Sequence, residues 1–222
     1  MMAVILAVET STQACSCALV EGGEVDEIFE IIPRQHAGKL LPMIERLMQK
    51  HGLCYEDLDA IAYGQGPGSF TGLRIASGVT QGIALGAGLP AVPVSTLASQ
   101  VLQLPYEQVS VFSCLDARID EVYWGMYFLS GGDVKLVGKE ELCKPEMLPS
   151  IGEDTFVAVG SGLDYLNRMP SSLQEKMIEK YPGITPRASA VAELALKNFQ
   201  LGLFQDAEEV NPVYLRDKVT HS

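Results

Sequence analysis

Glycine and hydroxyl residues gather in one segment whose composition suits the binding of an anion. Residues 64–74 read GQGPGSFTGLR and follow the apolar run 58–63, which is typical of a strand. A strand, a glycine loop and the start of a helix together direct backbone N–H groups at a phosphate, here those of Gly66, Gly68 and Ser69. The segment has neither the lysine and spacing of a P-loop nor the spacing GxGxxG. Phosphate binding is therefore one interpretation, and a loop that only sets the start of the next helix is the other.

A second pattern of glycines lies within the helix predicted over 71–86. Gly78, Gly82 and Gly86 share one helix face, although a glycine costs about 1 kcal/mol of helix stability relative to alanine. Such a stripe lets another backbone come close, either from the chain's own sheet or from a partner helix. The helix predicted over 36–51 also has a wider apolar face than one sheet requires. We therefore predict a helix-bundle interface that includes His36, Leu40, Met43, Leu47, Arg74, Ser77, Gly78, Gln81 and Gly82.

Nucleophiles and metal ligands are too sparse for a catalytic centre. The histidines are His36, His51 and His221, which have no metal-binding spacing, and none is near Ser69 in the sequence. A serine or cysteine nucleophile needs a base within reach. The sequence thus predicts no catalytic residue and no metal site.

The composition limits the classes of partner and the compartment. The net charge of -12 opposes direct binding to RNA or DNA. The cysteines form no Cys-x-x-Cys pair, which favours a reduced, cytoplasmic setting. The apolar run 3–8 is too short for a signal peptide or a membrane span. We expect a cytoplasmic protein that contacts neither membranes nor, on its own, nucleic acid.

The hydrophobic pattern predicts an α/β chain whose second half repeats the first in outline. Each half begins with strands in a meander and continues with a helix and a parallel strand. Pro105 marks the expected boundary between an N-terminal subdomain, 1–104, and a smaller C-terminal one, 105–222. This outline suggests two stacked α/β subdomains. The predicted strands are 4–8, 16–20, 25–32, 58–63, 92–94, 109–115, 122–129, 135–139 and 156–159, and the further predicted helices are 96–104, 163–168 and 188–203.

Several motifs together carry a family resemblance that spans nearly the whole chain. The most specific is GQGPGSFTGLR at 64–74, and ILAVETST at 5–12, PVSTL at 93–97, DAR at 116–118 and PVYLR at 212–216 support it. On these motifs the sequence resembles the TsaB (YeaZ) family of the bacterial tRNA threonylcarbamoyladenosine pathway. The resemblance implies the actin/sugar-kinase/Hsp70-like fold, with two ribonuclease-H-like subdomains of mixed sheets and a terminal segment that can return to the first.

The same resemblance implies a role without catalysis. A TsaB-like subunit docks and activates its catalytic paralogue, TsaD. That paralogue works with the ATPase TsaE to place a threonylcarbamoyl group on N6 of adenosine 37 in tRNAs that read codons beginning with A. The first two helices would contact TsaD, and in isolation a similar face would form a homodimer. The implied subunit reaches tRNA only through the complex and has no cofactor of its own, while ATP or ADP can bind at the shared interface.

The resemblance also identifies positions where catalysis would be lost. Thr96 and Gln100 stand where the paralogue carries a metal-binding histidine pair, and neither is a good ligand for a transition metal. The segment 116–118 replaces the paralogue's second phosphate loop, and a hairpin with Asp116 and Arg118 paired is the simpler interpretation. A weak nucleotide-proximal set remains, formed by Glu9, Thr10, Ser11, Gly66, Gly68, Gly160 and Gly162.

Two enzymatic alternatives stay open on the sequence. One is a small ATP-dependent phosphotransferase of the sugar- or acetate-kinase fold, which would bind ATP·Mg²⁺ tightly and turn it over. The other is a peptidase that acts on the TsaD paralogue and depends on a serine or histidine of this chain.

Overall fold

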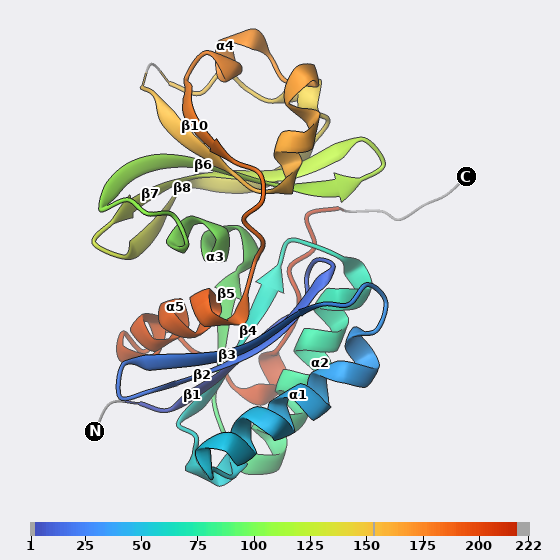
Figure 1. Cartoon of the computed structure of the whole chain (residues 1–222), viewed down its shortest axis with the longest axis vertical. Coiled ribbons are helices and arrows are strands. Elements are labelled where there is room, and N and C mark those ends of the chain that lie inside the picture. Colours follow the sequence, from blue (N-terminus) through green and yellow to red (C-terminus); the bar gives the residue numbers. More distant parts are fainter. Residues whose placement is uncertain (1–2, 153, 217–222) are drawn as a thin grey trace. The chain divides into compact units, whose positions relative to one another are not determined.

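The computed structural model describes residues 3–152 and 154–216, and the chain divides into two compact units (Figure 1). Of the described residues, unit 1 comprises those up to Ser99 together with Pro186–Val213, and unit 2 comprises those of Gln100–Thr185 together with Tyr214–Arg216. The first division, at Ser99/Gln100, lies a few residues before the expected boundary at Pro105, but Pro186–Val213, which fell within the expected second subdomain, belongs to unit 1. A long C-terminal segment, Pro186–Val213, thus returns to unit 1, whereas Tyr214–Arg216 belong to unit 2.

Unit 1 is built on a mixed sheet with the strand order β3-β2-β1-β4-β5. The predicted antiparallel meander forms β1, β2 and β3, and β4 and β5 then add in parallel, so that Val8 pairs with Cys17 on one side and Tyr63 on the other. Every residue of β1 is buried, as the continuous apolar run of a strand covered on both faces requires. The strands are β1 (Ile5–Glu9), β2 (Ala14–Glu21), β3 (Glu24–Ile31), β4 (Ala60–Gly66) and β5 (Ala91–Ser95).

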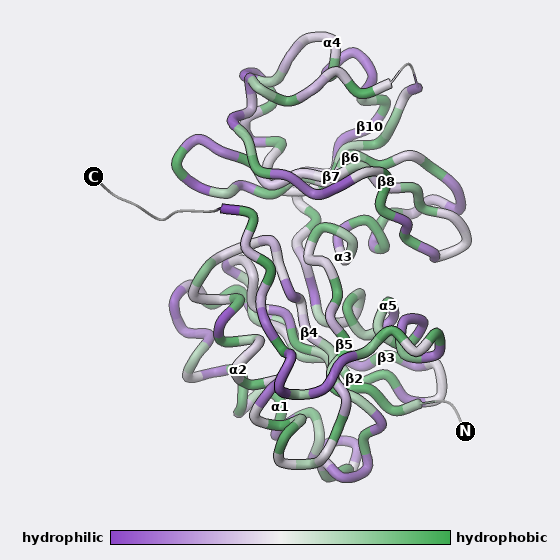
Figure 2. Tube along the Cα trace, turned by 180° about the vertical axis from the view of Figure 1, so that it is seen from behind, coloured by the Kyte–Doolittle hydropathy of each residue, from purple (hydrophilic) through white to green (hydrophobic). Residues whose placement is uncertain are grey.

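Helices α1 (His36–His51) and α2 (Phe70–Ala87) lie beside each other on one face of this sheet, and α5 (Ala188–Gln200) lies on the other (Figure 1). Helix α2 has few hydrophilic residues along its length (Figure 2), and its buried residues Leu73, Ala76, Thr80 and Ala84 recur at helical spacing on the face toward the sheet. Glycines in the left-handed conformation, Gly52 and Gly88, end α1 and α2. The shorter helices of this part of the chain are η1 (Tyr55–Asp57), α3 (Thr96–Leu102), which runs into unit 2, and η4 (Ala207–Glu209).

Helix α5 packs on the first sheet, although the sequence pattern assigned it to the second subdomain. Its buried face is formed mainly by small side chains, Ala188, Ala192 and Ala195 among them, and contacts β1 and β2. The N–H of Ala188 donates a hydrogen bond to Ser16 Oγ at 2.9 Å, which fixes the start of the helix. A face of small residues suits close packing on a sheet, but the order of elements along the chain does not reveal which sheet it covers.

Unit 2 repeats the mixed pattern with the strand order β10-β9-β6-β7-β8. Strands β6, β7 and β8 form a meander, and β9 and β10 add in parallel. The prediction of two mixed sheets is confirmed, but β10 was missed because it is short and only Met177 at its start is buried, so it has no apolar run. The predicted helix over 163–168 is a 3₁₀ helix. The elements are β6 (Gln108–Arg118), β7 (Glu121–Ser130), β8 (Asp133–Cys143), η2 (Pro145–Met147), β9 (Phe156–Val159), η3 (Ser161–Arg168), α4 (Ser171–Gln174) and β10 (Met177–Tyr181).

Candidate functional site

The glycine loop of unit 1 lies against the turn that follows β1. A Cβ atom on Gly64 would overlap the Glu9 carboxylate, and one on Gly72 would overlap the backbone carbonyl oxygen of Thr10. One on Gly68 would come within 2.6 Å of the Ser11 Cβ. These glycines are therefore required by the close approach of the chain's own residues 9–11.

Hydrogen bonds join the two segments. The Thr10 hydroxyl donates to the Gly72 carbonyl oxygen at 2.7 Å, and the Ser69 N–H donates to the Ser11 carbonyl oxygen at 2.8 Å. The Ser69 hydroxyl accepts the Gly72 N–H and caps α2. The Ser69 N–H, which the sequence offered to a phosphate, is thus already bonded within the chain.

Gly66 is enclosed by the returning C-terminal segment of unit 1. Its φ of +115° lies in the region that favours glycine, and a Cβ there would be 2.7 Å from the carbonyl oxygen of Val213. The N–H of Val213 in turn donates to the Gln65 carbonyl oxygen at 2.7 Å. Gly66 is therefore placed for backbone packing, and its expected role toward a phosphate stays a prediction.

Glu9 ends β1 as a buried carboxylic acid, with 1% of its surface exposed. Its Oε1 accepts the Ser11 N–H at 2.6 Å, whereas Oε2 has no hydrogen-bond partner among the described residues. Burial raises the pKa of the Glu9 carboxyl above its ordinary value. The Ser11 hydroxyl, the backbone N–H groups of Ser11 and Thr10, and the Thr96 hydroxyl act on the pKa in the opposite direction without overcoming burial.

We expect Glu9→Gln to raise the free energy of unfolding at pH 7, and the gain to shrink as the pH falls toward 4.5. Because the pKa of Glu9 is raised on folding, its stabilising contribution is full below the unfolded pKa near 4.5 and is lost as pH rises through the folded pKa. Glutamine keeps the shape without titrating. Each unit of pKa difference corresponds to about 1.4 kcal/mol. Urea unfolding of both proteins at the two pH values measures this, and a pH-independent difference would contradict it.

The two predicted glycines of unit 2 also serve packing. Gly160 has φ of +103°, and a Cβ on it would overlap the carbonyl oxygen of Cys114. A Cβ on Gly162 would come within 2.8 Å of Cys114 Sγ. Both glycines let the start of η3 lie against β6. No contact of these glycines points to a nucleotide, so that expected role stays a prediction.

The hairpin between β6 and β7 pairs its own charges. The predicted ion pair is confirmed, with Arg118 Nη1 3.2 Å from Asp116 Oδ2, and Asp116 Oδ1 also accepts the Arg118 N–H at 2.8 Å. The Asp116 N–H donates to Ser161 Oγ at 3.1 Å. The hairpin interpretation of residues 116–118 is therefore the correct one.

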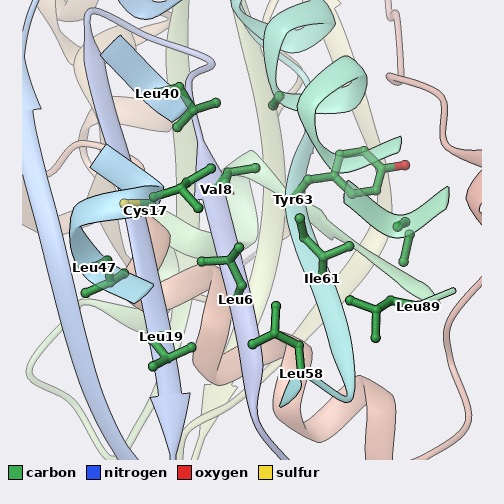
Figure 3. Packing of buried hydrophobic residues seen from close by; sticks show 14 of the residues in the cluster. Leu6, Val8, Cys17, Leu19, Leu40, Leu47, Leu58, Ile61, Tyr63 and Leu89 are labelled. Atoms are coloured by element: carbon green, nitrogen blue, oxygen red, sulfur yellow. The ribbon is translucent and has the colours of Figure 1, made fainter. Parts of the chain in front are cut away.

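Part of the predicted partner interface faces the core of unit 1 instead. Leu40, Met43 and Leu47 of α1 are buried, and Figure 3 shows Leu40 and Leu47 directed at strand residues that include Val8 and Cys17. Their assignment to an exposed face is wrong, because the apolar stripe of α1 is used to cover the chain's own sheet. The same applies to two polar residues: His36, whose Nε2 lies 3.0 Å from the Ala14 carbonyl oxygen, and Ser77, which is buried in α2.

The other predicted interface residues lie on the outer side of α2. Arg74, Gly78 and Gly82 are exposed, and Gln81 is half-buried and donates to the Ala207 carbonyl oxygen at 3.1 Å. A Cβ on Gly78, Gly82 or Gly86 would meet nothing within 4 Å. The glycine stripe thus faces away from the chain's own core.

Exposed apolar residues that the sequence did not indicate extend this surface. Leu41 of α1 is 43% exposed, and Phe70 and Leu85 of α2 are 46% and 54% exposed. The exposure of Leu41 could have been predicted from the sequence, because Leu41 lies outside the apolar stripe formed by Leu40, Met43 and Leu47. We define the outer helix face by the exposed residues Leu41, Pro42, Phe70, Arg74, Gly78, Gly82, Leu85 and Gly86.

The described parts of the chain hold no cluster of metal-binding side chains. In residues 3–152 and 154–216, no group of three or more His, Cys, Asp or Glu side chains could hold a metal ion. His51 lies 2.9 Å from Asp26 Oδ2, on the side of β3, and His221 lies outside the described residues. None of the described helices is long and apolar enough to cross a bilayer.

Known proteins match nearly the whole chain. The family described as "TsaD: tRNA N6-adenosine threonylcarbamoyltransferase" matches residues 28–221. The tRNA threonylcarbamoyladenosine biosynthesis protein TsaB of Escherichia coli (strain K12) is 37% identical, over 97% of this chain and 95% of that protein. The protein of the same name from Bacillus subtilis (strain 168) is 27% identical, over 96% of this chain and 93% of that protein.

A solved structure supports the same assignment. The structure of "YeaZ from Pseudomonas aeruginosa" matches with a TM-score of 0.89 and 38% identity, over 96% of this chain and 100% of that chain. The chain therefore has the fold of that YeaZ, and the predicted α/β class with two mixed sheets is confirmed. With identity above one third to a TsaB over almost its full length and the fold of a YeaZ, this chain belongs to the TsaB (YeaZ) family.

Proposed function

We propose that this chain is a non-catalytic scaffold and activating subunit of the complex that transfers a threonylcarbamoyl group to N6 of adenosine 37 in tRNAs reading codons that begin with A. The observation that carries the proposal is the outer helix face of unit 1. Three glycines of α2 lie open there beside exposed apolar side chains, where a second protein can bring a helix close. The names of the relatives, tRNA threonylcarbamoyladenosine biosynthesis proteins, indicate the pathway in which we place this chain.

The partner on this face is the catalytic TsaD-like paralogue, and the TsaE-like ATPase completes the complex. In isolation the same face forms a homodimer, so the homodimer and the TsaD complex exclude each other. Arg74 is positioned at the start of this face, with its guanidinium carbon 3.8 Å from the centroid of the Phe70 ring. The pair offers a cationic and aromatic surface of the kind enriched at protein interfaces.

Several features support a subunit that leaves chemistry to its partners. Thr96 and Gln100 are buried, and the Gln100 amide donates to Ser113 Oγ at 3.1 Å. The turn at 9–11 fills the space beside the glycine loop. The subunit has no cofactor of its own, and ATP or ADP binds at the shared interface of the complex. The net charge of -12 opposes direct binding of tRNA and so supports a subunit whose partners contact the tRNA. The complex works in the cytoplasm.

Reconstitution with purified TsaD-like and TsaE-like proteins, tRNA and the threonylcarbamoyl donor tests the proposal. We expect modified tRNA, measured by mass spectrometry of nucleosides, only when this chain is present. The isolated chain should neither hydrolyse ATP·Mg²⁺ nor cleave the TsaD-like protein. Turnover of ATP by the isolated chain would support the phosphotransferase instead, and cleavage of the paralogue would support the peptidase.

A further inference from the structure

A groove of about 430 Å³ lies in unit 1 between the C-terminal end of α2 and the segment that leads into η4. We infer that this groove, which we call the end groove, receives an apolar side chain and an adjacent lysine or arginine from one segment of the TsaD-like partner. The inference rests on the proposed function for the identity of the partner. It adds a contact whose chemistry differs from that of the glycine stripe.

Apolar side chains form the walls of the end groove. Ala84, Leu85 and Leu89 line it from the end of α2 and the residues just after it, and Phe204 lines it from the segment before η4. The Phe204 ring is 47% exposed and packs against Phe199 with 5.4 Å between the ring centroids, which holds it in position. Because Leu85 also belongs to the outer helix face, a partner bound on that face can reach the end groove over continuous apolar surface.

Hydrogen bonds fix the segment that carries Phe204. Ala91, at the start of β5, exchanges two backbone hydrogen bonds of 2.9 Å with Gln205. Gln81 of α2 donates to the Ala207 carbonyl oxygen at 3.1 Å. The end groove is therefore formed in the chain alone, so a partner does not have to order it on binding.

Negative charge at the end groove is not balanced by a basic residue. Asp206 and Glu208 line the groove, and neither forms an ion pair with any other described residue. The last turn of α2 also holds no basic residue, so the negative end of its dipole is uncompensated. An apolar groove with this charge favours an apolar side chain beside a cationic one, and it disfavours a phosphate or a carboxylate.

A segment of a partner protein suits this surface better than a free organic amine or a second copy of the chain. Apolar and open surface continues from the groove through Leu85 and Gly86 onto the outer helix face, and an amine confined to the groove would leave it uncovered. A second copy carries the same net charge of -12 and the same two carboxylates, so it offers less electrostatic attraction than a basic segment.

Removing both carboxylate charges tests the inference. The double variant Asp206→Asn/Glu208→Gln keeps the shapes of the side chains, and Asp206 makes no side-chain capping bond to η4 that could be lost. We expect it to bind the purified TsaD-like protein about 3- to 30-fold more weakly than the wild type in about 50 mM NaCl, as the loss of two exposed ion pairs predicts. The difference should shrink in about 300 mM NaCl, because salt screens such pairs. Isothermal titration calorimetry measures both affinities.

A matched control separates the groove from the overall charge. Glu107→Gln/Glu175→Gln changes the net charge equally at two exposed glutamates of unit 2, and it should bind like the wild type. Phe204→Ala should weaken binding by a similar factor at both salt concentrations, because it removes apolar contact only. Circular dichroism of each variant verifies that the chain is folded.

The possible outcomes separate this inference from the proposed function. Equal affinities for the two double variants overturn the inference while the proposed function stands. If Asp206→Asn/Glu208→Gln weakens only self-association, or abolishes only a rise in Tm caused by spermidine, the occupant is a second copy or a free amine, and the inference is again overturned. A wild-type chain that forms no complex with the TsaD-like protein contradicts the proposed function and the inference together.

Discussion

Gly82→Leu should weaken binding to the TsaD-like partner by about 5- to 150-fold while the isolated chain stays folded. A Cβ on Gly82 meets nothing within 4 Å, so leucine adds no strain within unit 1, and it improves helix propensity. In an interface where a partner helix approaches the glycine stripe, the added side chain overpacks the contact. Overpacking of this kind costs about 1–3 kcal/mol, which gives the stated range. Isothermal titration calorimetry measures the dissociation constant.

A matched control separates the loss of docking from a general effect of the added leucine. Gly183 of unit 2 also has open space at its Cβ and no left-handed backbone, but it lies outside the outer helix face. Gly183→Leu should bind the partner like the wild type. Circular dichroism should show unchanged helix content for both variants. Equal affinities for Gly82→Leu and Gly183→Leu would rule out the outer helix face as the docking surface.

Two glycine-to-alanine changes in α2 should have opposite effects on stability. At Gly72 the new methyl group would overlap the Thr10 carbonyl oxygen, which belongs to the backbone and cannot move aside alone. We expect Gly72→Ala to lower the free energy of unfolding by about 3 kcal/mol or more. At Gly78 the methyl group enters open space, so Gly78→Ala should raise stability by about 0.5–1 kcal/mol through helix propensity.

Urea unfolding followed by circular dichroism compares the two variants with the wild type. Because both changes are the same substitution in one helix, the sign of each effect depends on the surroundings of each glycine. A Gly72→Ala variant as stable as the wild type would show that the turn at 9–11 does not lie against α2 as described. A destabilised Gly78→Ala variant would show that the stripe packs within unit 1.

Local sequence patterns were sufficient for the elements that surround the glycine loop. The helix at 36–51 was predicted with its exact bounds, and Gly52 marked its end. The period of the glycines placed Gly78 and Gly82 on one face of α2, and the structure shows that face exposed. These features depend on residues only a few positions apart, so periodicity and capping residues report them directly.

Features that depend on distant residues were not accessible in the same way. The apolar width of α1 suggested a partner, but Leu40 and Leu47 belong to the core of unit 1, where α1 packs chiefly on β2. Burial of Glu9 contradicts the usual exposure of acidic residues, and the approach of Gly64 from β4 and of Thr96 from the start of α3 explains it. The assignment of α5 to a unit likewise depends on which sheet its alanine-rich face covers, and the order of elements along the chain does not reveal this.

The return of residues 186–213 to unit 1 has a consequence for synthesis of the chain on the ribosome. One face of the first sheet is covered by α1 and α2, which are made early, but the other face is covered by α5, which is made near the end. Until residues 188–200 have left the exit tunnel, β1 and β2 present an uncovered apolar surface. Unit 1 can therefore complete its folding only after most of unit 2 has been synthesised. During that interval we expect the nascent chain to be a client of chaperones.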